Sequence, residues 1–324
     1  MQGDWRPAAG LRHLIVTGGR DENMAVWDLE TYEPVTIIHA HRGPVWAVAV
    51  LVRKEFSRTV SGGDDGNIKI WDPFSGSRLH IIKAHKGKLS CLCLLESQAA
   101  AGSLVKVASG GVDKHIHFWS LDTGTKVLSI EGHEDEVTCL ATGLFKVAGD
   151  ASEAAAEAEG KKKKQKDLYS KKTLLMSGSR DRSVRVWLDD KTPLFVFYHS
   201  YAVNCVCMAA VFLDGEGRVT RSRKPVVLTG NDNGSLIVWS CDNGKEIKEL
   251  KVHKMSVQGV AACLLAGDDN ARLTPNQEGD NGQDTNHDNS AMLIATCSWD
   301  KVAVVQSLDA AITKQDVACD CSIS

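Results

Sequence analysis

The sequence predicts an all-β fold built from six repeats of four short strands each. Three observations support this prediction. A Ser or Thr is followed after four residues by Asp or Asn and, in five of the six copies, after ten residues by Trp. A His precedes every copy except the first, and an apolar strand begins four residues after each His. Self-similarity at a regular spacing is the sequence signature of a repeat architecture.

The clearest copy is SGGDDGNIKIWDP at 61–73. An apolar β-branched run leads into it, Gly, Asp and Asn supply a turn, and an alternating segment ends on the Trp. This order predicts strand, tight turn, strand. The six copies start at Thr17, Ser61, Ser109, Ser177, Thr229 and Thr296. The sixth has Gln306 in place of Trp, so we expect its repeat to be the weakest.

Another short strand follows each Trp, so each repeat is expected to hold strands a, b, c and d in chain order. The spacing predicts repeats at about 11–40, 41–84, 85–132, 133–198, 199–252 and 253–320. Residues 1–10 contain Pro and Gly and do not alternate, so they make a poor strand a. Thr17 lies too close to the N-terminus for a His at the usual distance, and the first repeat therefore lacks one.

The registered His, Ser/Thr, Asp and Trp resemble the WD-repeat β-propeller family over about 11–320. The resemblance implies one propeller domain over 1–324, with six blades favoured and a truncated set of seven as the alternative. It also implies a buried hydrogen-bonded tetrad in each complete repeat. The tetrads it implies are His41–Ser61–Asp65–Trp71, His85–Ser109–Asp113–Trp119, His133–Ser177–Asp181–Trp187 and His199–Thr229–Asn233–Trp239. An alternating C-terminal segment, ACDCSIS, is a candidate for the missing strand of the first repeat; a seventh repeat elsewhere is the alternative.

The repetition argues against catalysis, metal binding and cofactors. A catalytic Ser, His and Asp occur once, at a cleft, whereas these occur in register in four repeats. Cysteines such as Cys91 and Cys93 fall at strand-a positions that hold small residues in every repeat, which favours a packing role over zinc binding or a disulfide. No phosphate-binding loop, nucleophile elbow or dinucleotide fingerprint is found in the sequence.

Composition limits the possible partners and compartment. The net charge of −3 gives no general attraction to nucleic acid or to an anionic membrane. No apolar run reaches the roughly 18–20 residues that a membrane helix needs, and the N-terminus lacks an apolar signal region. We therefore expect a protein of the cytoplasm, the nucleus or both, with no membrane or small-molecule partner.

Two insertions interrupt the pattern, at 149–172 and 267–290, and both are expected to be disordered loops between strands a and b. The first contains KKKKQK at 161–166. Its Lys161–Lys164 run leaves open nuclear import or nucleic-acid binding as alternatives to a solvated loop. The second is rich in Asn, Asp and Gly but lacks the order of a calcium-binding loop.

The variable residues of the registered turns predict a partner-binding rim. By the resemblance, two positions face this rim, namely the residue before each turn Asp or Asn and the fifth residue after each His. The candidate binding residues are Arg20, Trp46, Asp64, Arg180, Asn204, Asp232, Gln258 and Trp299. Trp and Arg are enriched in the few residues that dominate binding energies at protein interfaces.

The sequence therefore predicts a non-enzymatic scaffold or adaptor that binds peptides or partner domains. One alternative is the substrate-recognition module of a ubiquitin ligase, although the Arg that such adaptors often carry after strand c is missing from WDLE and WDPF. The other is an RNA- or chromatin-associated factor that uses residues 161–172.

Overall fold

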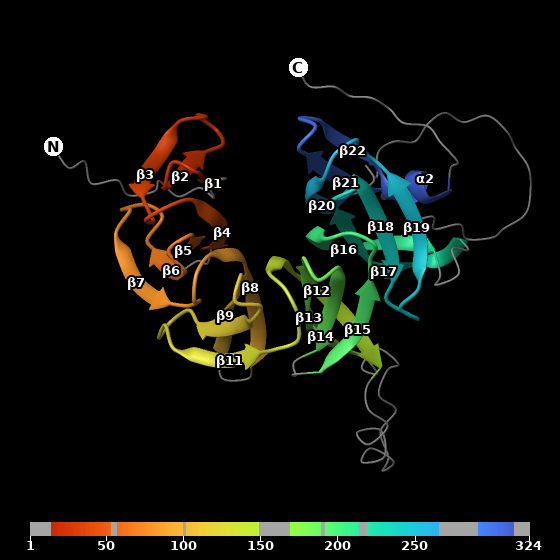
Figure 1. Cartoon of the computed structure of the whole chain (residues 1–324), viewed down its shortest axis with the longest axis horizontal. Helices are drawn as coiled ribbons and strands as arrows, with labels where there is room; N and C mark the ends of the chain where they lie inside the picture. The colour runs from red at the N-terminus through yellow and green to blue at the C-terminus, as the bar shows by residue number, and fades with distance from the viewer. Residues whose placement is uncertain are drawn as a thin grey trace, which may run out of the picture. The chain divides into compact units, whose positions relative to one another are not determined.

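The computed structural model describes residues 14–52, 57–99, 102–148, 169–188, 192–213, 219–265 and 291–313. Most of these residues lie in antiparallel sheets, and the chain divides into two compact units, Met1–Val203 and Asn204–Ser324 (Figure 1). The predicted all-β fold class is confirmed. The prediction of a single domain over 1–324, with its repeat boundaries, stays a prediction.

The described residues of the first unit form four sheets, and the strands of each follow one another in chain order. The first sheet contains β1 (Leu14–Gly18), β2 (Asn23–Asp28) and β3 (Pro34–His39). The second contains β4 (Val45–Val52), β5 (Ser57–Gly63), β6 (Asn67–Trp71) and β7 (Arg78–Lys83). The third contains β8 (Leu89–Ala99), β9 (Gly102–Gly111), β10 (Ile116–Ser120) and β11 (Lys126–Ile130). The fourth contains β12 (Val137–Ala148), β13 (Tyr169–Ser179), β14 (Ser183–Leu188) and β15 (Pro193–Tyr198).

Two sheets and a short helix form the second unit, whose first strand starts at the last residue of the first unit. The fifth sheet contains β16 (Val203–Leu213), β17 (Val219–Asn231), β18 (Ser235–Ser240) and β19 (Glu246–Lys251). The sixth contains β20 (Val257–Leu265), β21 (Ala291–Ser298) and β22 (Ala303–Ser307), and α2 (Leu308–Thr313) follows it.

The first and sixth sheets have three strands within the described residues, where the repeat pattern predicts four. In the first, the strand that the repeat pattern places before β1 is not among the described residues, and both residues 1–13 and the C-terminal candidate segment lie outside them. In the sixth, α2 follows β22 directly and was not predicted. It forms because Leu308 and Ile312, one helical turn apart, are both buried on the core of the second unit.

The β12–β13 hairpin reaches further than the sequence predicts. The two strands pair continuously out to Ala148 and Tyr169, so 169–172 belong to a strand and not to the insertion assigned to 149–172. Backbone pairing, which composition does not report, extends the ladder through the lysines at its end. The Lys161–Lys164 run, the insertion at 267–290 and the C-terminal segment lie outside the described residues.

The innermost strands pack against one another in the first unit, where β4 contacts β8 and β8 contacts β12 (Figure 1). Small residues such as Ala47 and Ala49 allow this approach and pack on a core that includes Leu89 and Leu92. Gly62 is required by the same closeness, because a Cβ there would collide with the Leu89 side chain of the next sheet. The small residues expected at strand-a positions therefore lie where neighbouring sheets come close together.

Three hydrogen-bonded tetrads lie within the described part of the first unit, each joining a loop, two strands and a turn of one sheet. In the second sheet, His41 contacts Asp65 through Nδ1 at 2.8 Å and Ser61 through Nε2 at 2.7 Å, and Trp71 Nε1 donates to Ser61 Oγ at 2.9 Å. The other two use His85, Ser109, Asp113 and Trp119, and His133, Ser177, Asp181 and Trp187, with distances of 2.7–3.0 Å.

The remaining repeats carry parts of this network. In the second unit, Trp239 Nε1 donates to Thr229 Oγ1 at 2.9 Å, and Asn233 accepts the Ser235 N–H. His199 belongs to the first unit. The sixth sheet joins His253 to Asp300 at 3.1 Å and to Thr296 at 2.9 Å without a Trp. The first sheet keeps the Trp27–Thr17 bond at 2.9 Å, but Thr17 is exposed.

The charges in the tetrads follow from their hydrogen bonds. Burial alone would raise the pKa of Asp65, but the bond and charge of His41 and the Asn67 N–H outweigh it and hold that pKa at about 2. Burial lowers the pKa of His41, so this imidazole is neutral at pH 7. Since an ionised carboxylate only accepts, the bonds run in one direction, from Trp71 to Ser61 to His41 to Asp65.

Removing the central hydroxyl tests this network. Ser61→Ala leaves the buried Trp71 N–H and His41 Nε2 without a partner, so we expect it to lower the free energy of unfolding by about 1–3 kcal/mol. The measurement is urea unfolding followed by circular dichroism. Thr17→Ala is the control, because the same Trp–hydroxyl bond is exposed there and should contribute less. Equal losses in the two variants would contradict a buried, cooperative network.

The tetrad carboxylates also predict a pH dependence. The pKa of both Asp65 and Asp113 falls to about 2 in the folded chain, against a usual value of 3.8. The stability they contribute is therefore complete above pH 3.8 and is lost as the pH falls from there towards 2. Asp65→Asn should flatten the fall in unfolding free energy across this window. Asp122→Asn, at an exposed turn, should keep the slope of the wild-type chain, and an Asp65→Asn chain with an unchanged slope would refute the assignment.

Candidate functional site

A β-bulge at the start of strand a brings one side chain towards the loops in the second, third, fourth and sixth sheets. The pairing of β4 with β5 shifts between Val45 and Ala47, so Trp46 falls outside the regular ladder. The same shift occurs at Ser90, Thr138 and Gln258. A bulge adds one residue to a strand and re-aims its side chain. The bulge explains why the fifth residue after the His lies at the rim in these four sheets.

Trp46 is the centre of the rim on the first unit. Its Nε1 donates to Asp64 Oδ1 at 3.1 Å, which ties strand β4 to the β5–β6 turn. Lys88 Nζ lies 4.3 Å from the centre of its ring and Arg20 Cζ lies 5.9 Å away. Cations at this range are attracted to the face of an indole. The loops of three consecutive sheets therefore meet at one aromatic side chain, which is 39% exposed.

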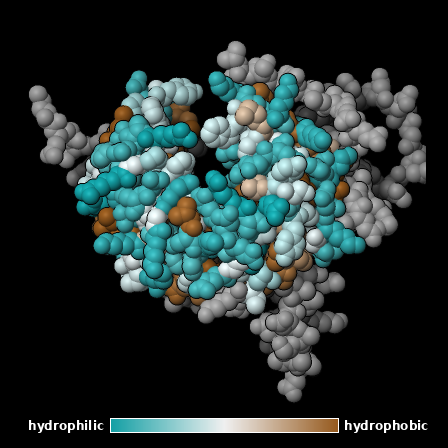
Figure 2. Space-filling view, viewed as in Figure 1, coloured by the Kyte–Doolittle hydropathy of each residue, from teal (hydrophilic) through white to brown (hydrophobic). Residues whose placement is uncertain are grey.

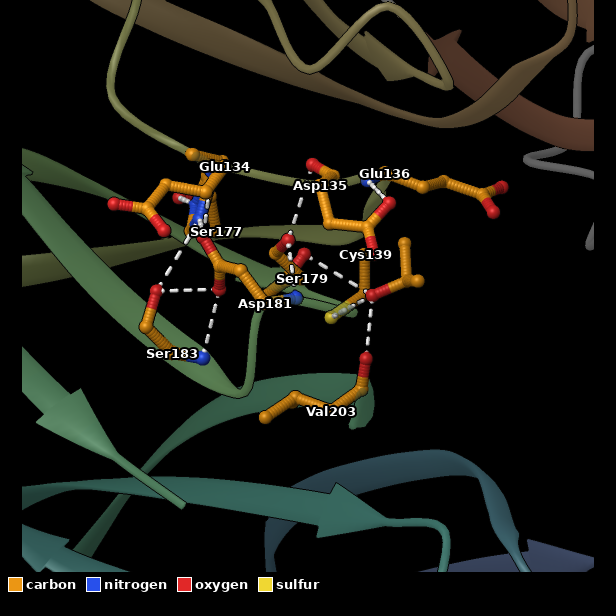
Figure 3. Close-up of polar contacts among 12 residues, drawn as sticks. Glu134, Asp135, Glu136, Cys139, Ser177, Ser179, Asp181, Ser183 and Val203 are labelled. Atoms are coloured by element: carbon orange, nitrogen blue, oxygen red, sulfur yellow. Dashed lines mark hydrogen bonds and ion pairs between the residues drawn. The ribbon is translucent and has the colours of Figure 1, made fainter. Parts of the chain in front are cut away.

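Glu136 joins this group to the fourth sheet. Its carboxylate pairs with Lys88 Nζ at 2.9 Å and with Arg180 Nε at 2.9 Å, and it accepts the Ser90 hydroxyl. Figure 3 shows its side chain extending away from Ser177 and Asp181 of the tetrad. Burial would raise the pKa of Glu136, but the bonds from Ser90 and Lys88 and the charge of Arg180 outweigh it and lower that pKa. Glu136 is thus buried and ionised, and it pairs with two cations, Lys88 and Arg180. We call the set Arg20, Trp46, Asp64, Lys88, Glu136 and Arg180 the first-unit rim.

Lys88 and Glu136 were missed in the sequence. A signal for them exists, because both are the third residue after a tetrad His, just before strand a begins. The residues at this position are Pro44, Lys88, Glu136, Ala202 and Ser256. Their variety indicates a position whose side chain is not used by the core. The opposite charges of Lys88 and Glu136 in consecutive repeats would have suggested an ion pair.

Asn204, Asp232 and Gln258 come together on the second unit through a residue that the sequence did not single out. Ser256 Oγ accepts from Asn204 Nδ2 and from Gln258 Nε2, both at 2.7 Å, and donates to Asp232 Oδ1 at 2.9 Å. Asn204 Nδ2 also donates to Asp232 Oδ1 at 2.7 Å. We call these four residues the Ser256 cluster.

Trp299 lies beside this cluster, because its backbone N–H donates to the Ser256 carbonyl at 3.2 Å. Its side chain is 58% exposed, and that of the neighbouring Met255 is 51% exposed. The eight candidate binding residues therefore fall into two groups. Arg20, Trp46, Asp64 and Arg180 lie on the first unit, and Asn204, Asp232, Gln258 and Trp299 lie on the second.

The surroundings of Cys93 and His85 fit structural roles. Burial raises the pKa of the Cys93 thiol to about 12, which keeps it protonated at neutral pH. His85, Asp113 and His117 bring possible metal-binding atoms within 4.8 Å of one another. Both ring nitrogens of His85 are, however, bonded to Asp113 and Ser109 at 2.8 Å, so a metal there would have to break a tetrad. No helix within the described ranges has the length and apolar composition that a membrane crossing requires.

These features define a class of protein, an all-β repeat protein in which three described sheets hold the same buried tetrad, the other three hold parts of it, and the loops differ. A family model described as WD domain, G-beta repeat matches residues 32–72, 76–120 and 167–187. The chain is similar to WD repeats over these three stretches, which agrees with the predicted β-propeller class. A search of curated proteins found no match to the chain. WD40 repeats generally mediate interactions between proteins, and such proteins are typically non-enzymatic.

Glu136 provides a test of the first-unit rim. Glu136→Gln removes the charge that Lys88 and Arg180 share, so we expect the free energy of unfolding to fall by about 1–3 kcal/mol. Glu134 lies two residues earlier and is exposed, so Glu134→Gln should change the free energy of unfolding by no more than about 0.5 kcal/mol. Urea unfolding at neutral pH measures both. Equal effects would mean that the Glu136 ion pairs are as weak as ordinary surface pairs.

Proposed function

We propose that this protein acts in the cytoplasm, the nucleus or both as a non-enzymatic interaction scaffold. In this proposal, the first-unit rim binds peptide segments of partner proteins. The observation that carries the proposal is the continuous series of contacts from Arg20 through Trp46, Lys88 and Glu136 to Arg180. It joins the loops of all four sheets of the first unit.

The composition of the rim suits protein recognition. Trp and Arg are the residues most enriched among binding hot spots. Trp46 is partly exposed, and the Arg180 side chain is 60% exposed although its Nε is paired. Figure 2 shows a mainly hydrophilic face on which apolar side chains occur in small separate groups. Such a surface favours recognition through a few anchors over a broad apolar interface.

The rim is also held in place before a ligand arrives. Asp64 holds the Trp46 indole, and Glu136 holds Lys88 and Arg180. Ordering a flexible side chain on binding costs about 0.5–1.5 kcal/mol, and a prearranged site avoids much of that cost. The two carboxylates of the rim, Asp64 and Glu136, are thus already paired within it.

Quantitative co-purification from cells tests the proposal. We expect Trp46→Ala and Arg180→Glu each to reduce the recovery of specific partners by at least about tenfold, the loss expected from a hot-spot residue. Tyr198→Ala is the matched control, because Tyr198 is an exposed aromatic on the outer strand β15 of the same unit. A fourth variant lacks residues 150–168, the part of the insertion that precedes β13.

Circular dichroism must show that each variant is folded. Partners that stay bound to Trp46→Ala and Arg180→Glu but are lost on deletion of 150–168 would refute the rim as the binding surface. They would favour the Lys-rich insertion instead. A fall of the log affinity with log salt would then indicate a nucleic-acid partner.

A further inference from the structure

We propose that the Ser256 cluster and Trp299 of the second unit bind a basic side chain, the guanidinium or ammonium group of an Arg or Lys in a partner peptide. This deepens the proposed function by naming the ligand chemistry of a second rim site, and it rests on that function. It uses residues separate from the first-unit rim.

The hydrogen bonds of the cluster determine which of its atoms remain for a ligand. The Ser256 hydroxyl has one donor and two acceptor positions, and Asp232, Asn204 and Gln258 occupy all three. Both N–H groups of the Asn204 amide are also used, on Asp232 Oδ1 and Ser256 Oγ. These bonds fix which way the Asn204 and Gln258 amides face. The Asp232 carboxylate can only accept, and the Ser256 hydroxyl already donates to it, so both amides must turn their N–H groups towards these oxygens.

Three oxygens of the cluster then lack a donor among the described residues. They are Asp232 Oδ2, Asn204 Oδ1 and Gln258 Oε1. All three groups bond to the same hydroxyl, so they lie close together, and Asp232 and Gln258 are exposed. The site offers these three acceptors, one of them charged, against the one remaining N–H of the Gln258 amide, and therefore favours a ligand rich in donors. Arg and Lys side chains have donors and no acceptors.

The proposed site includes the exposed indole of Trp299, whose backbone lies next to the cluster. Its backbone is one hydrogen bond from Ser256, and Met255 next to it presents an exposed thioether side chain. Trp is the aromatic ring that attracts cations most strongly. The nearby loops also carry Lys254 and Lys301, but the only charge within the cluster is that of Asp232. Its carboxylate beside a Trp favours a cationic ligand over an acidic one.

The test uses the whole chain with its Trp indoles labelled with ¹⁵N. The Trp299 resonance is assigned by its absence from Trp299→Phe. The probes are the tripeptides Gly-Arg-Gly and Gly-citrulline-Gly, because citrulline has the shape of arginine without its charge. We expect the Trp299 resonance to shift with the Arg peptide at concentrations where the citrulline peptide has no effect. Asp232→Asn should weaken this response at least tenfold.

Asp242→Asn is the control. This exposed Asp also lies on the second unit but pairs with Lys224 at 3.5 Å, away from the cluster. It should leave the response unchanged, and the other indole resonances should keep their positions in every variant. Equal shifts with both peptides, no shift at all, or a response that survives Asp232→Asn would overturn the inference. Loss of partners on Trp46→Ala in the co-purification would still stand in those cases, so the two proposals can fail separately.

Discussion

The hydroxyl at the end of strand b is the group on which each complete sheet depends. In the second sheet, Ser61 Oγ accepts the Trp71 N–H and donates to His41, which in turn donates to Asp65. One buried atom thus connects strand c, the loop before strand a and the b–c turn. Since polar groups without partners are costly in a protein interior, these bonds require the loop and the turn to lie where they do. The rim side chains are then placed by backbone that the tetrad already holds.

Much of this arrangement was open to prediction because it repeats. The constant spacing from Ser61 to Asp65 and Trp71 reports strands and a turn, and the structure confirms the four strands and their order in the second to fifth sheets. The four residues of the tetrad in the second sheet could be named from the family resemblance alone. The helix α2 could not, because the sixth sheet departs from the repeat after β22 and the burial of Leu308 and Ile312 depends on tertiary contacts. The extension of β13 to Tyr169 depends on pairing with β12, which local composition does not encode.

The rim shows a different limit of prediction. Trp46 and Arg180 stand out in the sequence because of their residue type and register. Lys88 and Glu136 are ordinary charged residues, and their importance comes from meeting each other across neighbouring sheets. Ser256 is less conspicuous still, although three predicted residues bond to its hydroxyl. Register reveals which positions face the rim, but the bonds among them require coordinates.

The bulge at the start of strand a has a consequence for how such a protein diversifies. In a regular strand, alternation fixes which face of the sheet each side chain occupies. A change of residue there therefore also changes the packing on that face. The extra residue at Trp46, Ser90, Thr138 and Gln258 is released from that rule. An aromatic ring, a hydroxyl or an amide can occupy it above the same buried network. Selection can therefore change what the loops recognise while the interior of each sheet stays as it is.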